Sequence, residues 1–66
     1  MTRADLIEKY SDAIKSMFEK SGDDSGVCLE KLIYTYRHLN DSEKDVYEGI
    51  PENFDWDAFG KDVEQL

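Results

Sequence analysis

The residues whose chemistry could support catalysis are few in this chain of 66 residues. It has one histidine, His38, and one cysteine, Cys28, and ten residues of helix separate them by about 15 Å. The two side chains therefore cannot form a Cys–His nucleophile pair within one chain. Cys28 also lies on an apolar stripe, where a lone cysteine is more often a small core residue than a reactive thiol.

The sequence also lacks the residue patterns that are typical of metal-binding and phosphate-binding sites. The segment SGDDSGVCLEKL, residues 21–32, has a weak likeness to a helix-flanking calcium loop. It has Ser21 and Leu32, however, where such a loop needs Asp and Glu. No glycine-rich phosphate loop, paired thiolates or His-x-x-x-His pair occurs. Because a helical domain of this size also rarely encloses a substrate, we expect no enzyme activity, no cofactor and no metal.

The distribution of charge is the most informative feature. The chain has 16 acidic and 8 basic residues, which gives a formal net charge of −8. Residues 1–40 hold seven acids and six bases, whereas residues 41–66 hold nine acids and two bases. The first part is therefore nearly balanced at −1, and the last 26 residues carry −7.

The C-terminal acids are also arranged unfavourably for helix stability. Asp41, Asp45 and Glu48 would share one helix face, where like charges four residues apart repel each other. This arrangement predicts a surface that meets a positively charged partner. The alternative is a surface that only keeps a small protein soluble. The predicted partner-binding acidic residues are Asp41, Asp45, Glu48, Asp55, Asp57, Asp62 and Glu64.

A second candidate patch combines aromatic and basic side chains. Tyr34, Arg37 and His38 lie on the side of their helix opposite its apolar stripe, and Trp56 is a further aromatic anchor. Tyr, Trp and Arg are favoured at interface hot spots, so these four residues are a second partner-binding candidate. Tyr34 would instead be core if the third or fourth helix covered this face, and that is the arrangement we expect.

Apolar residues recur at helical spacing along the first 40 residues. We predict one helix over residues 3–20, capped by Thr2 and ended by Gly22, and a second over residues 26–39, capped by Ser25. The short turn between them predicts an antiparallel hairpin. The apolar faces are Leu6, Ile7, Tyr10, Ala13, Ile14, Met17 and Phe18 in the first helix, and Cys28, Leu29, Leu32, Ile33, Tyr36 and Leu39 in the second.

Two shorter helices follow. The third spans residues 40–49, where Asn40 and Glu43 have the form of a capping box. In the last segment Asp55 can cap a helix whose apolar stripe is Trp56, Phe59, Val63 and Leu66. We expect Phe54, Trp56 and Phe59 to be core that closes the hairpin, although the same rings could form a binding epitope. The prediction is one all-α domain over residues 1–66, a small four-helix domain with a long antiparallel helical hairpin plus two shorter C-terminal helices.

The composition also indicates whether the chain folds and in which compartment it is found. At 39% hydrophobic residues the chain is too apolar for a disordered acidic tail, and it has no apolar run of about 18 residues that would span a membrane. The first ten residues lack the apolar core of a signal peptide. One cysteine fits a reducing compartment, so we expect a cytoplasmic protein.

These features predict a small acidic protein-interaction module, an inhibitor or regulator that docks its acidic C-terminal half on a basic surface of a partner protein. If that surface binds nucleic acid, the acidic half would compete as a substitute for phosphates. The alternative is a helical homodimer or adaptor whose apolar and aromatic surface is the interface and whose acids only solubilise. Direct DNA binding is disfavoured, because the acids of the third helix would face phosphates.

Overall fold

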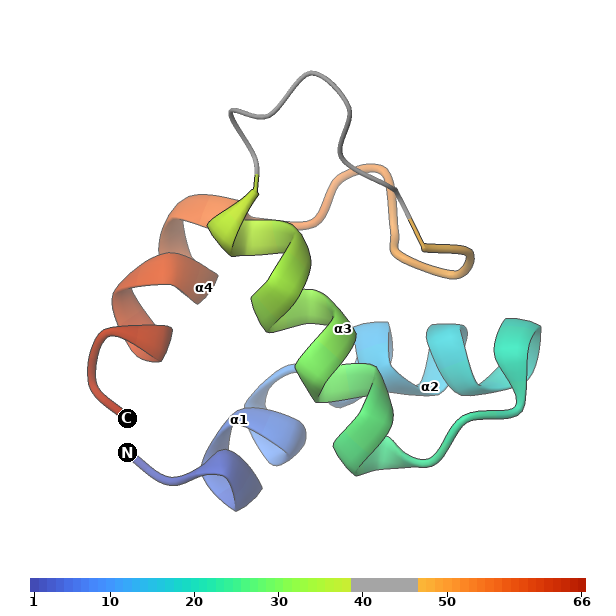
Figure 1. Cartoon of the computed structure of the whole chain (residues 1–66), viewed down its shortest axis with the longest axis horizontal. Coiled ribbons are helices and arrows are strands. Elements are labelled where there is room, and N and C mark those ends of the chain that lie inside the picture. The colour runs from blue at the N-terminus through green and yellow to red at the C-terminus, as the bar shows by residue number, and fades with distance from the viewer. Residues whose placement is uncertain (39–46) are drawn as a thin grey trace.

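The computed structural model describes residues 1–38 and 47–66, and these residues form four α-helices and no strand (Figure 1). The helices are α1 (Arg3–Lys9), α2 (Ser11–Ser21), α3 (Ser25–Arg37) and α4 (Trp56–Val63). The all-α class is therefore confirmed for the described residues. α3 is the central element, because it packs against α1, α2 and α4. The third helix predicted over residues 40–49 falls mostly outside the described residues, and its described end, residues 47–49, is not helical.

Local hydrogen bonds begin α1 and α4, and end α2, where the sequence predicts. The Thr2 hydroxyl accepts a bond from the Asp5 N–H at 3.1 Å, and the Asp5 carboxylate accepts one from the Thr2 N–H at 2.9 Å. Gly22 ends α2 in the left-handed conformation, with φ 77°. The Asp55 carboxylate caps α4 by accepting a bond from the Ala58 N–H at 3.0 Å.

The predicted cap of α3 is wrong by one residue. The N-cap is Asp24, whose carboxylate accepts a bond from the Val27 N–H at 2.9 Å, and Ser25 is the first helical residue. Asp24 has the extended backbone of an N-cap, with φ −71° and ψ 172°, which aims its side chain at the free N–H groups of the first turn.

The single helix predicted over residues 3–20 is interrupted at Tyr10. The backbone there leaves helical geometry, with φ −107° and ψ 32°, and α1 and α2 point in different directions (Figure 1). The Tyr10 ring packs on Phe54 and Phe59, with centroids 5.6 and 5.1 Å away, and its hydroxyl donates to Asp62. These contacts with distant residues account for the interruption, which no proline or glycine marks. The antiparallel orientation of the first two helical segments stays a prediction.

The core is formed by residues that the apolar faces predict. All of its members come from the four helices, and three aromatic residues around α4 pack against it: Phe54, Trp56 and Tyr36. Among the described residues of the predicted faces, Phe18 is 53% exposed and Leu66 is 48% exposed, and the predicted face residue Leu39 lies outside the described residues. The buried hydrophobic core cluster is Leu6, Ile14, Met17, Cys28, Leu29, Leu32, Ile33, Phe59 and Val63.

The rings near the C-terminus pack on the helices as the core interpretation predicts. Phe59 is fully buried, while Phe54 and Trp56 are half-buried and contact each other with centroids 4.6 Å apart. Tyr36 of α3 contacts Phe59 at 6.4 Å. Edge-to-face contacts of this kind add to the apolar burial that joins α4 to the rest of the domain. No helix among the described residues has the length and apolar character needed to cross a membrane.

Candidate interaction surfaces

The outer face of α4 presents exposed carboxylates. Asp57 lies in its first turn and Glu64 at its C-terminal cap, and the exposed Lys61 lies between them in the sequence. Two more exposed acids, Glu48 and Glu52, lie in the chain that leads into this helix. None of these four acids forms an ion pair with another described residue. They therefore stay accessible to a partner.

Two of the predicted acidic residues are engaged by the fold itself. Asp55 caps α4, and the Asp62 carboxylate accepts bonds from the Tyr10 hydroxyl at 2.6 Å and the Lys9 ammonium at 2.7 Å. The Asp62 side chain is only 15% exposed. The bond from Lys9, and then that from Tyr10, holds the pKa of Asp62 below its ordinary value. Asp62 therefore joins α4 to the junction of α1 and α2.

The contact with Asp62 also changes the pKa of the Tyr10 hydroxyl. Burial, and then its bond to the Asp62 carboxylate, raises the pKa of Tyr10 well above its usual range. Tyr10 therefore stays a neutral hydrogen-bond donor at any ordinary pH. Two further predicted acidic residues, Asp41 and Asp45, lie outside the described residues.

The structure divides the predicted aromatic and basic patch into two parts. Tyr34 in the last turn of α3 and His38 at its C-terminal cap have ring centroids 4.3 Å apart, and Tyr34 also contacts Tyr47 at 6.3 Å. Arg37 beside them is exposed. Trp56, in contrast, has its ring contacts with the aromatic residues of the C-terminal segment.

The expectation that a neighbouring helix buries Tyr34 is wrong. Its side chain is 46% exposed, because α4 packs against the opposite side of α3, where Tyr36 contacts Phe59. Tyr34 is therefore accessible on the surface, together with the neighbouring basic residue Arg37.

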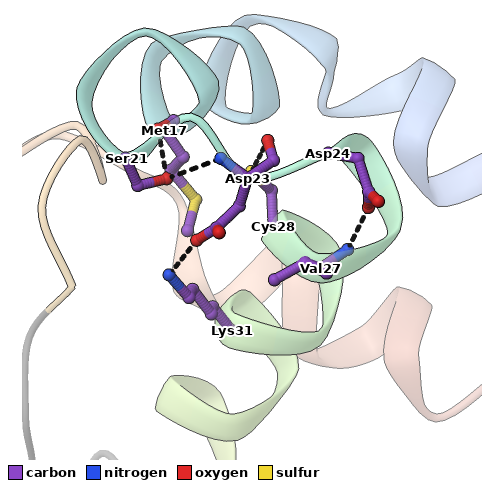
Figure 2. Close-up of polar contacts among 7 residues, drawn as sticks. All are labelled: Met17, Ser21, Asp23, Asp24, Val27, Cys28 and Lys31. Atoms are coloured by element: carbon purple, nitrogen blue, oxygen red, sulfur yellow. Dashed lines mark hydrogen bonds and ion pairs between the residues drawn. The ribbon is translucent and has the colours of Figure 1, made fainter.

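The turn between α2 and α3 holds a cluster of polar contacts (Figure 2). The Asp23 carboxylate accepts a bond from Lys31, and this contact lowers the pKa of Asp23 and raises that of Lys31. The Asp23 N–H donates to the Ser21 hydroxyl at 3.3 Å. The buried Cys28 thiol donates to the Asp23 carbonyl at 3.4 Å, and burial raises its pKa. The thiol form is therefore favoured over the nucleophilic thiolate, and the cluster serves to fix the turn.

The N-terminal half has a groove that the sequence does not predict. Its volume is about 330 Å³, and its walls come from α1, α2 and the first residue of α3. No local pattern in the sequence indicates it, because its walls come from residues of three separate helices. The lining residues are Ile7, Ser11, Ile14, Lys15, Phe18 and Ser25.

The described part of the chain offers no group of three His, Cys, Asp or Glu side chains that could hold a metal ion. Comparison of the chain with protein-family models, with curated proteins and with solved structures finds no match in any of the three. The proposals below therefore rest on the residues and geometry of this chain.

Proposed function

We propose that this chain is a small non-catalytic interaction protein that docks its acidic C-terminal half on a basic surface of a partner protein and thereby inhibits or regulates it. One observation carries the proposal. The last 26 residues hold nine acids and two bases, and those described on and before α4 that do not serve the fold are exposed.

The two halves of the chain use their acids differently. In residues 1–38, Asp5 and Asp24 cap helices, and Asp23 and Glu30 pair with Lys31 and Arg3. More than half of the acids of the N-terminal half thus stabilise local structure.

The C-terminal half has more acids than its own contacts use. Asp55 and Asp62 serve the fold, whereas Glu48, Glu52, Asp57 and Glu64 are exposed without an ion pair to a described residue. Exposed charges of one sign raise the rate at which an oppositely charged partner associates, and they favour that partner over others.

A partner that normally binds nucleic acid is the target that this surface suits best. Its basic side chains would pair with the carboxylates of the acidic half in place of phosphates, so that the protein competes with the nucleic acid. Such binding depends on many solvent-exposed ion pairs, which dissolved salt screens, and it therefore weakens strongly as the salt concentration rises. The lone buried Cys28 fits a reducing cytoplasm as the place of action. We take α2 and α3 to form an antiparallel hairpin on which α4 is held.

A pair of matched charge reversals tests the proposal. The variant Asp57→Lys/Glu64→Lys reverses two exposed acids seven residues apart around α4. The control Asp12→Lys/Glu19→Lys reverses two exposed acids with the same spacing on α2, so that the net charge changes equally. Each variant and the wild type is used to capture partners from a cell lysate, and circular dichroism checks that all three stay helical.

The proposal predicts a stoichiometric partner of the acidic C-terminal half that the wild type and the α2 control retain and the α4 variant loses. A nucleic acid duplex should displace this partner, and retention should fall at least tenfold between about 50 and about 200 mM salt. A partner that both variants keep equally well, or that binds independently of salt, would show that the acids only solubilise the chain.

A helical homodimer or adaptor is the second candidate. The exposed side chains of Phe18, Tyr34 and Leu66 favour it, because each presents apolar area to solvent. This candidate predicts self-association and a melting temperature that rises with protein concentration.

A further inference from the structure

The groove on the N-terminal half has an apolar lining that is only partly covered by this chain. Phe18 is 53% exposed and Ile7 is half-buried, whereas Ile14 beside them is buried. Lys15 also lines the groove, and its aliphatic stem adds to the apolar wall while its ammonium stays in water. A groove of about 330 Å³ that is open to solvent suits inserted side chains better than an enclosed small molecule.

Three exposed acids are sequence neighbours of residues that line the groove. Glu8, Asp12 and Glu19 each directly follow a lining residue in the sequence, so each lies about 100° further round the helix than that residue. All three are exposed, and none forms an ion pair within the described residues.

These are the acids of the N-terminal half that the fold does not use. The other four, Asp5, Asp23, Asp24 and Glu30, serve as helix caps or ion-pair partners. Each of the three uncommitted carboxylates of this half is therefore the direct sequence neighbour of a residue that lines the groove.

We propose that this groove binds an amphipathic helix of a partner protein whose apolar face is flanked by lysine or arginine. The apolar residues of that helix contact Ile7, Ile14 and Phe18, and its basic flank meets Glu8, Asp12 and Glu19. None of the four described helices has a clear excess of basic residues, so a second copy of this chain cannot supply the flank. The groove lies apart from α4 in the sequence, and the proposal holds whether or not the acidic C-terminal half has a partner.

Two synthetic peptides test this assignment. Both have about five helical turns with leucines at helical spacing, and one has lysines beside the leucine stripe where the other has glutamates. Backbone amide NMR titrations of the full chain report both the affinity and the place of binding. The variants are Phe18→Ser, the α2 pair Asp12→Lys/Glu19→Lys, and as controls Tyr34→Ser and the α4 pair Asp57→Lys/Glu64→Lys. Because Phe18 and Tyr34 are both about half exposed, neither serine variant should unfold the chain.

We expect the lysine-flanked peptide to bind with amide shifts centred on the lining residues of the groove, and the glutamate-flanked peptide to bind at least tenfold more weakly. Phe18→Ser and the α2 pair should each weaken binding about tenfold. Tyr34→Ser and the α4 pair should leave it unchanged, which separates this proposal from that of the C-terminal half. Equal binding of both peptides, shifts centred on α4, or groove shifts that appear on concentrating the protein without peptide would each overturn it.

Discussion

Asp62 connects three helices through two hydrogen bonds. Its carboxylate lies on α4, Lys9 ends α1, and Tyr10 separates α1 from α2. Tyr10 and Asp62 are 52 positions apart in the sequence, so their hydrogen bond connects the N-terminal and C-terminal parts of the chain. This contact explains why an acid predicted for a docking surface acts inside the fold.

Replacing Tyr10 by phenylalanine removes one donor of this contact and keeps the ring on Phe54 and Phe59. Since a hydrogen bond to a charged acceptor contributes more than a neutral one, and Lys9 still reaches Asp62, we expect the free energy of unfolding to fall by about 1 kcal/mol. Urea denaturation followed by circular dichroism measures this change. Tyr34→Phe, which removes an exposed hydroxyl, should cost less than about 0.5 kcal/mol, and an equal loss in both variants would contradict the role of the bond.

The same carboxylate makes the stability depend on acidity. The pKa of Asp62 is lower in the folded chain than in the unfolded one, so its contribution is present above about pH 4 and is lost as the pH falls through the folded pKa. Asp5 and Asp23 have lowered pKa values as well and act in the same direction. The unfolding free energy of the wild type should therefore decline as the pH falls below about 4.

The variant Asp62→Asn tests this dependence. It should be less stable than the wild type at neutral pH and should lose less stability on acidification, because the titrating group is gone. Melting temperatures measured from about pH 6 to about pH 2 show the difference. If the melting temperatures of the wild type and Asp62→Asn fall equally with decreasing pH, Asp62 does not cause the loss of stability in acid.

At the scale of elements, the turn before α4 is held against α2 by a close backbone approach. Gly49 has φ 92°, and a Cβ atom there would lie 2.6 Å from the Met17 Cα and 2.8 Å from the Ser16 carbonyl oxygen. Gly22 at the end of α2 also has a positive φ, but a Cβ atom there would meet nothing within 4 Å. The two glycines therefore differ in their surroundings and share the left-handed backbone.

Alanine substitutions at these glycines separate the two effects. Gly22→Ala should lower the unfolding free energy by about 1 kcal/mol through backbone strain alone. Gly49→Ala should lower it by about 2 kcal/mol more, because the turn must move away from α2. Urea denaturation of both variants measures the difference. Equal losses would show that the turn yields without cost and that the contact with α2 contributes nothing.

The elements also show which parts of the fold the sequence could predict. The helix caps at Thr2, Asp24 and Asp55 each bond to a backbone N–H three residues further along the chain. Because these bonds are local, the residue types and their spacing predict the caps, to within one residue for α3. The interruption at Tyr10 depends on Phe54, Phe59 and Asp62, and no local pattern contains those contacts. For the same reason the sequence places Phe18 in the core, whereas the direction of α2 after the interruption leaves it exposed.

The candidate surfaces follow the same division. The excess of C-terminal acids is visible in the sequence, because charge counts need no structure. The removal of Asp62 from that surface is not visible, because its partners Lys9 and Tyr10 come from the other end of the chain. The groove likewise exists only where three helices meet.

At the scale of the whole molecule, a net charge of −8 opposes self-association while exposed apolar side chains favour it. We expect repulsion to prevail at low salt, since each copy carries the same excess of acids. The chain should then sediment as a monomer at micromolar concentration, and its melting temperature should not change over a tenfold range of about 10 to about 100 μM protein. A homodimer would instead melt at a higher temperature as its concentration rises.

Raising the salt to about 0.5 M separates the two contributions, because it screens the acids and leaves the apolar contacts intact. The monomer should melt at a higher temperature in this buffer, as the repulsion among its own acids weakens, and the increase should be independent of protein concentration. If sedimentation shows a dimer only at high salt, the acids are what keeps the copies apart. If wild type dimerises already at low salt and Phe18→Ser does not, the exposed groove is a self-association surface, and the homodimer explains the chain better than a basic partner does.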